Sequence, residues 1–422
     1  MRKPGTIANL FFRRHNYVKR CIGIDVSKGK STIAVLRPAG EIVRKPFDVR
    51  HTPKELSILS SYIQHLEGDT RILMECTGHY HEPILKVLSD SGFFVSAVKP
   101  HLIKEYDGDN SLRKVKSDPA DAKKIAGYTL DKWHLLRQYS AMDNTRTQLK
   151  TLNTQFQFLM RQKTALKNNL ISLLDLTYPG VNAFFDSPVR KNGSQKWLDY
   201  AYSFWHADCV RTIGLKTFTE RYKKFCKRHG YIFQPDKPKS LFESSKELIA
   251  VAPKDHIYKD MVLSAIGQVN LISAQIESMR LKMDELASTL PEYEVVMNMF
   301  GVGHTFGPQL MAEIGDISRF NHRSALTAFA GVDPGVNQSG KMKIDSNRAS
   351  KRGAPRLRKT LFQIMQTLMQ KAPADNRVYL FMMKKKAEGK PYHVYMTAGA
   401  NKFLRIYYGT VKAHLASQSQ TE

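Results

Sequence analysis

The chain has 422 residues, of which 65 are Lys or Arg and 38 are Asp or Glu, so its formal net charge is +27. Apolar residues make up 42% of the sequence and charged residues 24%, which is typical of folded globular proteins and excludes wholesale disorder. The charge indicates a polyanionic partner, either nucleic acid or an anionic membrane surface. The length predicts roughly two to three domains.

No stretch approaches the ~20 apolar residues of a membrane-spanning helix, so we expect no membrane insertion. Residues 1–20 are basic and lack the apolar core of a secretory signal, and a basic arm that contacts nucleic acid is favoured over a mitochondrial presequence. The four cysteines form no CxxC pair, which argues against a structural zinc site or a disulfide framework. We therefore expect a cytoplasmic, nucleoid-associated protein.

Residues 21–47 contain three strand-like runs, CIGIDV, STIAVL and EIVRKPF, and the turn residues between them predict an antiparallel meander. Three such strands followed by alternating helices and strands predict an α/β domain of ribonuclease-H-like layout over residues 21–140, a mixed sheet with flanking helices. The later elements are a helix at 52–66 opened by Thr52 and Pro53, a strand at 71–76, a helix near 80–88, a strand at 93–100 and a helix from about 118.

Residues 141–292 contain two stretches with apolar residues three and four apart, one from Thr145 to about Leu174 and the other from Val269 to Leu290. This spacing is typical of coiled coils, and the alternative is a pair of amphipathic helices in a monomeric bundle. An aromatic and basic insert separates them at about 178–255. Its aromatic residues could stack on unpaired bases or form a small hydrophobic core: Trp197, Tyr200, Tyr202, Phe204 and Trp205.

The last part of the chain, residues 293–422, is predicted to be mainly helical. Gly301-Val302-Gly303 is typical of a tight turn and, less often, of a helix-hairpin-helix contact to phosphate. An apolar helix ends near Asp316, and a short helix at 324–330 leads into a Gly/Pro-rich stretch. A strongly basic run at 341–359 then merges into a helix at 361–369.

Four acidic residues stand out by their placement. Asp25 lies inside the first strand, where an ionised carboxylate is costly without a partner or a metal, and Glu75 ends the fourth strand. Asp118 and Asp121 are three residues apart and share one face of a helix. If the predicted sheet places the first and fourth strands side by side, the four carboxyls converge and their repulsion favours bound Mg²⁺.

A structural interpretation competes with this one for the second pair. Asp118 before Pro119 resembles an N-cap followed by proline, and Asp121 would then favour the helix dipole three residues later. His79 and His81 lie near Glu75 and could assist proton transfer, although exposed loop histidines without that role are favoured.

The acidic segments GIDVSKGK (23–30), MECTGHYHEPI (74–84) and KSDPADAKKIA (116–126) resemble the motifs of the insertion-sequence one-ten transposases. The C-terminal part is similar to the second domain of that family: FGVGHTFGPQLMAEIGD (300–316), RFNHRSALTAFAGVDP (319–334), QSGK (338–341), SKRGAPRLRK (350–359) and GKPYHVYMTAGANKFLRI (389–406). The resemblance implies a RuvC-like domain whose metal-binding DEDD tetrad is Asp25, Glu75, Asp118 and Asp121, followed by a C-terminal serine transposase domain over 293–422.

The resemblance also implies that Ser339 is the nucleophile that forms a covalent phosphoserine link to DNA. Gly340 leaves room for a phosphate to approach, and the neighbouring cations would offset the charge of the transition state. Met342 replaces a glycine common in the family, and Ser346 and Ser350 are rival serines. The predicted nucleic-acid-binding residues are Lys341, Lys343, Arg348, Lys351, Arg352, Arg356 and Arg358.

Target DNA, donor DNA and a non-coding bridge RNA are the partners that the resemblance implies. The two coiled-coil stretches predict a homo-oligomer, a dimer or tetramer, because recombination of two duplexes requires several coordinated active sites. Mg²⁺ is the only cofactor expected. Three functions remain open at this point: a recombinase that uses serine attack, a RuvC-like structure-selective nuclease that uses metal-activated water, and a nucleic-acid-binding protein without catalysis.

Overall fold

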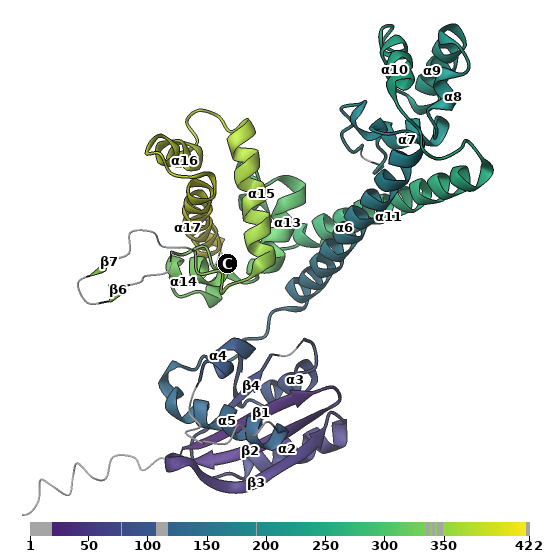
Figure 1. The fold of residues 1–422 in the computed structure, drawn as a ribbon. Helices are drawn as coiled ribbons and strands as arrows, with labels where there is room; N and C mark the ends of the chain where they lie inside the picture. Colours follow the sequence, from purple (N-terminus) through teal and green to yellow (C-terminus); the bar gives the residue numbers. More distant parts are fainter. Residues whose placement is uncertain are drawn as a thin grey trace, which may run out of the picture. The chain divides into compact units, whose positions relative to one another are not determined.

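The computed structural model describes residues 19–76, 78–106, 117–190, 192–334, 338–339, 342–343 and 349–418 (Figure 1). They form two compact units, one ending at Ala141 and the other beginning at Met142. Most of the predicted basic arm lies outside the described residues. Within the described ranges, no helix combines the length and the apolar character that crossing a bilayer requires.

The first unit is built on a five-stranded mixed sheet with the strand order β3-β2-β1-β4-β5. Strands β1, β2 and β3 pair in antiparallel fashion, whereas β4 and β5 continue the sheet parallel to β1. The predicted meander and the neighbouring first and fourth strands are therefore confirmed. The strands are β1 (Arg20–Ser27), β2 (Lys30–Arg37), β3 (Glu41–Arg50), β4 (Thr70–Glu75) and β5 (Phe94–Val98).

Helices cover both faces of this sheet. Leu56 of α2 (Pro53–Gln64) and Leu85 of α3 (Glu82–Asp90) pack in one core cluster with alternate residues of β1. As predicted, the Thr52 side chain caps α2 by accepting the Glu55 N–H. The first unit also contains α4 (Pro100–Lys104) and α5 (Asp118–Asp131).

Helix α5 crosses β1 at Gly23 on the other face of the sheet. A Cβ atom at this position would lie 2.2 Å from the carbonyl oxygen of Ala122, so only glycine permits the approach. This contact fixes the first turn of α5 over the same end of β1 that carries Asp25.

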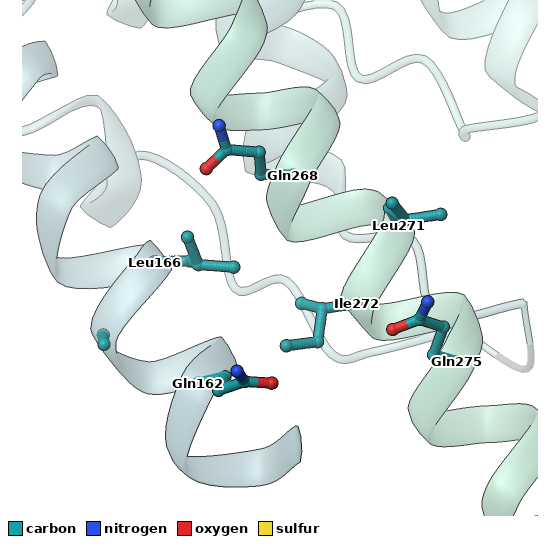
Figure 2. A pocket seen from close by; sticks show the side chains of 7 residues that line it. Gln162, Leu166, Gln268, Leu271, Ile272 and Gln275 are labelled. Atoms are coloured by element: carbon teal, nitrogen blue, oxygen red, sulfur yellow. The ribbon is translucent and has the colours of Figure 1, made fainter. Parts of the chain in front are cut away.

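Two long helices dominate the second unit, α6 (Asn144–Thr177) and α11 (His256–Ser288). Phe156, early in α6, shares a core cluster with Met283, late in α11, whereas Leu170 clusters with Val262, so the helices are antiparallel. Both predicted amphipathic helices are confirmed. They pair within one chain, with Leu166 and Ile272 facing each other across the seam (Figure 2).

The insert folds as a small helical subdomain against the ends of α6 and α11 (Figure 1). Trp197, Tyr200, Phe204 and Trp205 are buried in its core, so base stacking by these four residues is contradicted. Only Tyr202 of the predicted set is exposed, at 56%. The helices of this subdomain are α7 (Lys196–Ser203), α8 (Asp208–Arg211), α9 (Leu215–His229) and α10 (Lys237–Glu247).

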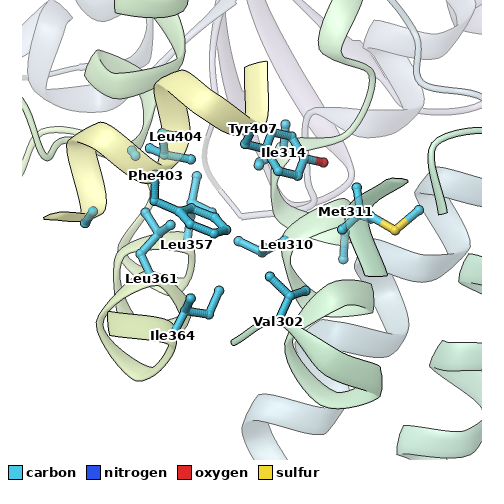
Figure 3. Close-up of a cluster of buried hydrophobic side chains, with 14 of the residues drawn as sticks. Val302, Leu310, Met311, Ile314, Leu357, Leu361, Ile364, Phe403, Leu404 and Tyr407 are labelled. Atoms are coloured by element: carbon cyan, nitrogen blue, oxygen red, sulfur yellow. The ribbon is translucent and has the colours of Figure 1, made fainter. Parts of the chain in front are cut away.

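The remaining helices pack around a core to which Leu310, Leu361 and Phe403 contribute from three different helices (Figure 3). Helix α15 begins at Pro355, earlier than predicted, because the apolar spacing continues back to the buried Leu357 between basic residues. The elements are α12 (Tyr293–Met297), α13 (Gly303–Ile314), α14 (Arg323–Ala330), β6 (Gln338–Ser339), β7 (Met342–Lys343), α15 (Pro355–Lys371), α16 (Arg377–Ala387) and α17 (Tyr392–Gln418).

Candidate active site

Two of the predicted acids end neighbouring parallel strands. Ile24 of β1 is paired with Met74 of β4, and Asp25 and Glu75 are the next residues on the two strands. The parallel register therefore brings these two carboxyls to the same edge of the sheet. Both residues are half-buried.

Asp118 and Asp121 lie in the first turn of α5. Ser117, not Asp118, is the N-cap, and its side chain accepts the N–H of Ala120 at 3.4 Å. The competing interpretation, in which Asp118 caps this helix, is therefore wrong. Since Ser117 takes the capping position, the Asp118 carboxyl is left for other interactions at the exposed end of the helix.

The four carboxyls influence one another electrostatically. The pKa of Asp25 is raised to about 6, mainly because burial disfavours the charged carboxylate and further because Asp121, Asp118 and Glu75 repel it. The structure thus gathers the four acids that the sequence singled out. A bound divalent cation would reduce this repulsion further.

The donor set suits a hard divalent cation. Carboxylate oxygens are the ligands that Mg²⁺ prefers, and the site combines several of them with excess negative charge. Among the described residues, no three Asp, Glu, His or Cys side chains are already grouped around a common metal position. The negative charge and the oxygen ligands of the four carboxyls therefore fit a divalent cation. Their side chains would have to rotate toward a common point to coordinate it.

A lysine and a further aspartate adjoin the four acids and were not predicted. Lys30 Nζ lies 2.9 Å from Asp48 and 3.9 Å from Asp118. The pKa of Asp48 is lowered, first by the hydrogen bond from the Thr32 hydroxyl and then by that from Lys30. Asp25, Thr32 and Asp48 form one cross-strand row. The alternation of the predicted meander could have revealed this row.

The two histidines near Glu75 differ in environment. His79 is exposed, and its Nδ1 lies 2.7 Å from Glu82 at the start of α3. His81 is half-buried, and burial lowers its pKa. The pairing of His79 with Glu82 favours the loop interpretation over a role in proton transfer.

Ser339 lies in a two-stranded ribbon, where its backbone is paired with Met342. The rival Ser350 has a structural role, because its hydroxyl donates to Asp333 at 2.7 Å and its N–H donates to the Asp333 carbonyl. Ser346, the other rival, lies outside the described residues.

The predicted nucleic-acid-binding residues fall into different environments. Lys351 and Arg352 are exposed. Arg356 donates to the Thr154 hydroxyl at 2.7 Å, and Arg358 donates to the Ala330 carbonyl at 2.9 Å, so both also support the fold. Burial lowers the pKa of Arg358. Lys341, Arg348 and the side chain of Lys343 lie outside the described part of the chain.

The base of this basic segment is held by close backbone packing. A Cβ atom on Gly353 would lie 2.1 Å from the Phe329 carbonyl oxygen, so the segment can pass this point only with glycine. Lys351 has a positive φ of 53°, which is rare for a residue with a side chain. The exposed cations therefore project from a tightly constrained backbone.

Comparison with known proteins covers most of the chain. Residues 22–179 match a family model of DEDD type described as a transposase, and residues 293–380 match the model of the transposase IS116/IS110/IS902 family. A 44.8 kDa protein of insertion element IS116 from Streptomyces clavuligerus is 22% identical over 371 residues, covering 87% of this chain and 88% of the relative. A mini-circle transposase for IS117 from Streptomyces coelicolor is 22% identical over 366 residues, covering 85% of this chain and 86% of the relative.

The four acids lie in the first matched range and Ser339 lies in the second. Nearly all of the insert lies outside both matched ranges.

Proposed function

This chain belongs to the IS110 family of transposases, and we propose that it cuts and rejoins the DNA of an insertion sequence by attack of Ser339 on a phosphodiester. It is a DNA transposase by membership, and a DEDD domain points to the use of a divalent metal. We identify that metal as Mg²⁺, held by Asp25, Glu75, Asp118 and Asp121 in a domain of ribonuclease-H-like, RuvC-like fold.

The proposal is supported by the parallel register that brings Asp25 and Glu75 to one sheet edge, and by the raised pKa of Asp25, to which burial contributes most and Asp121, Asp118 and Glu75 contribute further. Such a site supplies positive charge at a scissile phosphate when it holds Mg²⁺. In the proposed step, the Ser339 hydroxyl oxygen bonds to phosphorus while the bond to the leaving deoxyribose oxygen breaks. The serine proton leaves to a base and a proton reaches the departing oxygen, so the step is balanced.

The exposed cations Lys351 and Arg352 support binding of the DNA backbone. Lys341, Lys343, Arg348, Arg356 and Arg358 complete the proposed nucleic-acid-binding set. We propose that target and donor DNA are recognised through a bridge RNA, a division of labour that leaves sequence reading to base pairing. Residues 21–140 and 293–422 are assigned as the catalytic domains, joined by residues 141–292, in a protein of the bacterial nucleoid.

We propose that the transposase acts as a dimer or tetramer through α6 and α11. A groove of about 340 Å³ runs between these helices, with Leu166, Leu271 and Ile272 among its lining residues (Figure 2). Leu271 is 64% exposed, which is unusual for leucine on a helix already paired along another face. Covering this groove with a second copy would remove apolar surface from water.

The decisive test is to trap the protein on nicked DNA with Mg²⁺ and to map the modified residue. Wild-type protein and Ser350→Ala should both form a protein–DNA adduct, provided Ser350→Ala retains its fold by circular dichroism. Ser339→Ala should form none. An adduct mapped to another serine would exclude Ser339 as the nucleophile.

A metal-dependent nuclease is the second candidate, because the carboxyl site would need no serine to activate water. In that case Ser339→Ala would cut DNA as fast as the wild type, and neither protein would form an adduct.

A further inference from the structure

The insert contains a pocket whose rim is cationic. The pocket has a volume of about 460 Å³, and Arg221, Lys224 and Arg228 of α9 line it. These residues are spaced i, i+3 and i+7 and therefore share one face of the helix. Lys254, which precedes α11, adds a fourth cation from a different segment. All four residues are exposed.

These cations lack a bound acidic partner among the described residues. Within the described parts of the chain, none of their side chains makes a hydrogen bond or an ion pair with another residue. The aspartate of the neighbouring helix α8, Asp208, is already bound by Arg211 at 2.5 Å. A concave site lined by charges of one sign concentrates the field and attracts the opposite charge. The pocket is therefore built to receive an anion.

The floor of the pocket is apolar. Phe204 and Phe225 belong to the aromatic core of the insert and also line the pocket, together with Ile213. An inorganic anion would use only the cationic rim. A nucleotide would use both parts, with its phosphate on the rim and its base in edge contact with the apolar lining, because Phe204 and Phe225 are each only 5% exposed and offer no open ring face. The volume falls in the range of pockets that hold small organic ligands.

The shape favours an unpaired strand over a duplex. A base inside a duplex reaches a pocket only after it is unstacked and unpaired, at a cost of a few kcal/mol, whereas an unpaired base is free to enter. Single-stranded DNA and single-stranded RNA offer the same combination of phosphate and base.

We propose that this pocket binds one nucleotide of a single-stranded nucleic-acid segment. The phosphate contacts Arg221, Lys224 and Arg228, and the base lies over the apolar lining at Ile213 and the exposed edges of Phe204 and Phe225, without stacking on a ring. The residues that line the pocket lie outside both ranges that match transposase models, and the site requires neither Ser339 nor the four carboxyls. It would anchor an unpaired strand during recombination, separately from the chemistry.

The test is lysine footprinting on the full-length protein. Acetylation is measured by mass spectrometry with single-stranded DNA, single-stranded RNA or duplex DNA present, under conditions that saturate binding. Lys224 and Lys254 should be protected at least fivefold by a single strand. The exposed lysines Lys216, Lys223 and Lys227, which lie on another face of α9, serve as the internal control.

Each outcome decides something. Protection by only one kind of single strand identifies the natural source and supports the proposal. Equal protection by duplex DNA would refute the assignment to an unpaired strand. Absence of protection at Lys224 and Lys254, or protection no greater than at the control lysines, would refute the pocket itself. Activity of the carboxyl site and of Ser339 does not enter the readout, so failure here is distinct from failure of the proposed function.

Matched variants provide a second measurement. The triple variant Arg221→Ala/Lys224→Ala/Arg228→Ala and the control Lys216→Ala/Lys223→Ala/Lys227→Ala each remove three positive charges from one helix. The pocket variant should bind a single strand at least tenfold more weakly than the control. The dependence of log Kd on log salt for the pocket variant should be shallower by about 0.7, since the variant loses one phosphate contact and each contact contributes about 0.7. Equal losses in the two variants would contradict the proposal, and footprinting of the wild type decides the matter if a variant misfolds.

Discussion

Replacing Asp25 by Asn should stabilise the metal-free protein while abolishing its activity. The pKa of Asp25 is about 6 instead of the ordinary 3.8, because burial and three neighbouring carboxyls disfavour its ionised form. A tenfold change in an ionisation constant is worth about 1.4 kcal/mol, and solvent screens this half-buried carboxyl, so the ionised side chain destabilises the folded state by about 1–2 kcal/mol. An uncharged isostere removes that penalty.

The pH dependence follows from the same values. Below pH 3.8 the carboxyl is protonated in both the folded and the unfolded state and has no effect. Between pH 3.8 and about 6 the unfolded chain releases the proton but the folded chain keeps it, so stability falls as pH rises. Above pH 6 the full penalty applies. The advantage of Asp25→Asn should therefore be largest at neutral pH and vanish near pH 4.

Hydrogen exchange of the β1 amides in the full-length protein, measured with EDTA, is the appropriate assay because it reports the stability of the first unit alone. At pH 7.5 the amides of Asp25→Asn should be protected about tenfold more than those of the wild type, the equivalent of about 1.4 kcal/mol. Asp48→Asn is the control of opposite sign, because hydrogen bonds lower the pKa of Asp48 and its loss should reduce protection. Equal protection of Asp25→Asn and wild type at pH 7.5 would refute the electrostatic account of the site.

Three further predictions concern the same two units. Mg²⁺ should protect the β1 amides of the wild type from exchange but not those of Asp25→Asn. The apparent affinity of the wild type for Mg²⁺ should fall about tenfold per pH unit below pH 6, because Asp25 becomes protonated. Binding of Mg²⁺ that does not depend on pH would count against Asp25 as a ligand. Gly23→Ala should prevent the first unit from folding, since its Cβ would lie 2.2 Å from the Ala122 oxygen, and circular dichroism with limited proteolysis would show it. Arg146→Ala should destabilise the second unit by about 3–5 kcal/mol, because it leaves the buried Glu292 without its partner, and a thermal midpoint equal to that of the wild type would contradict this.

The sequence predicts most of the first sheet and the long helices because their signals are local. Alternation with period two and turn residues define β1, β2 and β3, and the Thr52-Pro53 pair marks the start of α2 through contacts within one turn. Asp25 also stands out locally, as a charged residue inside an apolar strand. These features depend on residues close in the chain, so no knowledge of the tertiary structure is needed.

Other features depend on contacts between distant residues and had to come from the structure. Ser117 and Asp118 are both good capping residues, and the backbone geometry at the start of α5 decides for Ser117. Lys30 lies close to Asp118 only because α5 crosses the sheet. The sequence favours a small core for the aromatic residues of the insert but leaves a stacking surface open, and only the packing of helices far apart in sequence decides for the core.

The sequence alone thus determined which side chains could perform chemistry and which segments are helices or strands, because both follow from residue type and near-neighbour spacing. Tertiary structure decided which charges face one another, which aromatics are buried and which cations of α9 are left without a partner. These are properties of long-range packing, where burial and Coulomb energy depend on distances that spacing along the chain does not fix.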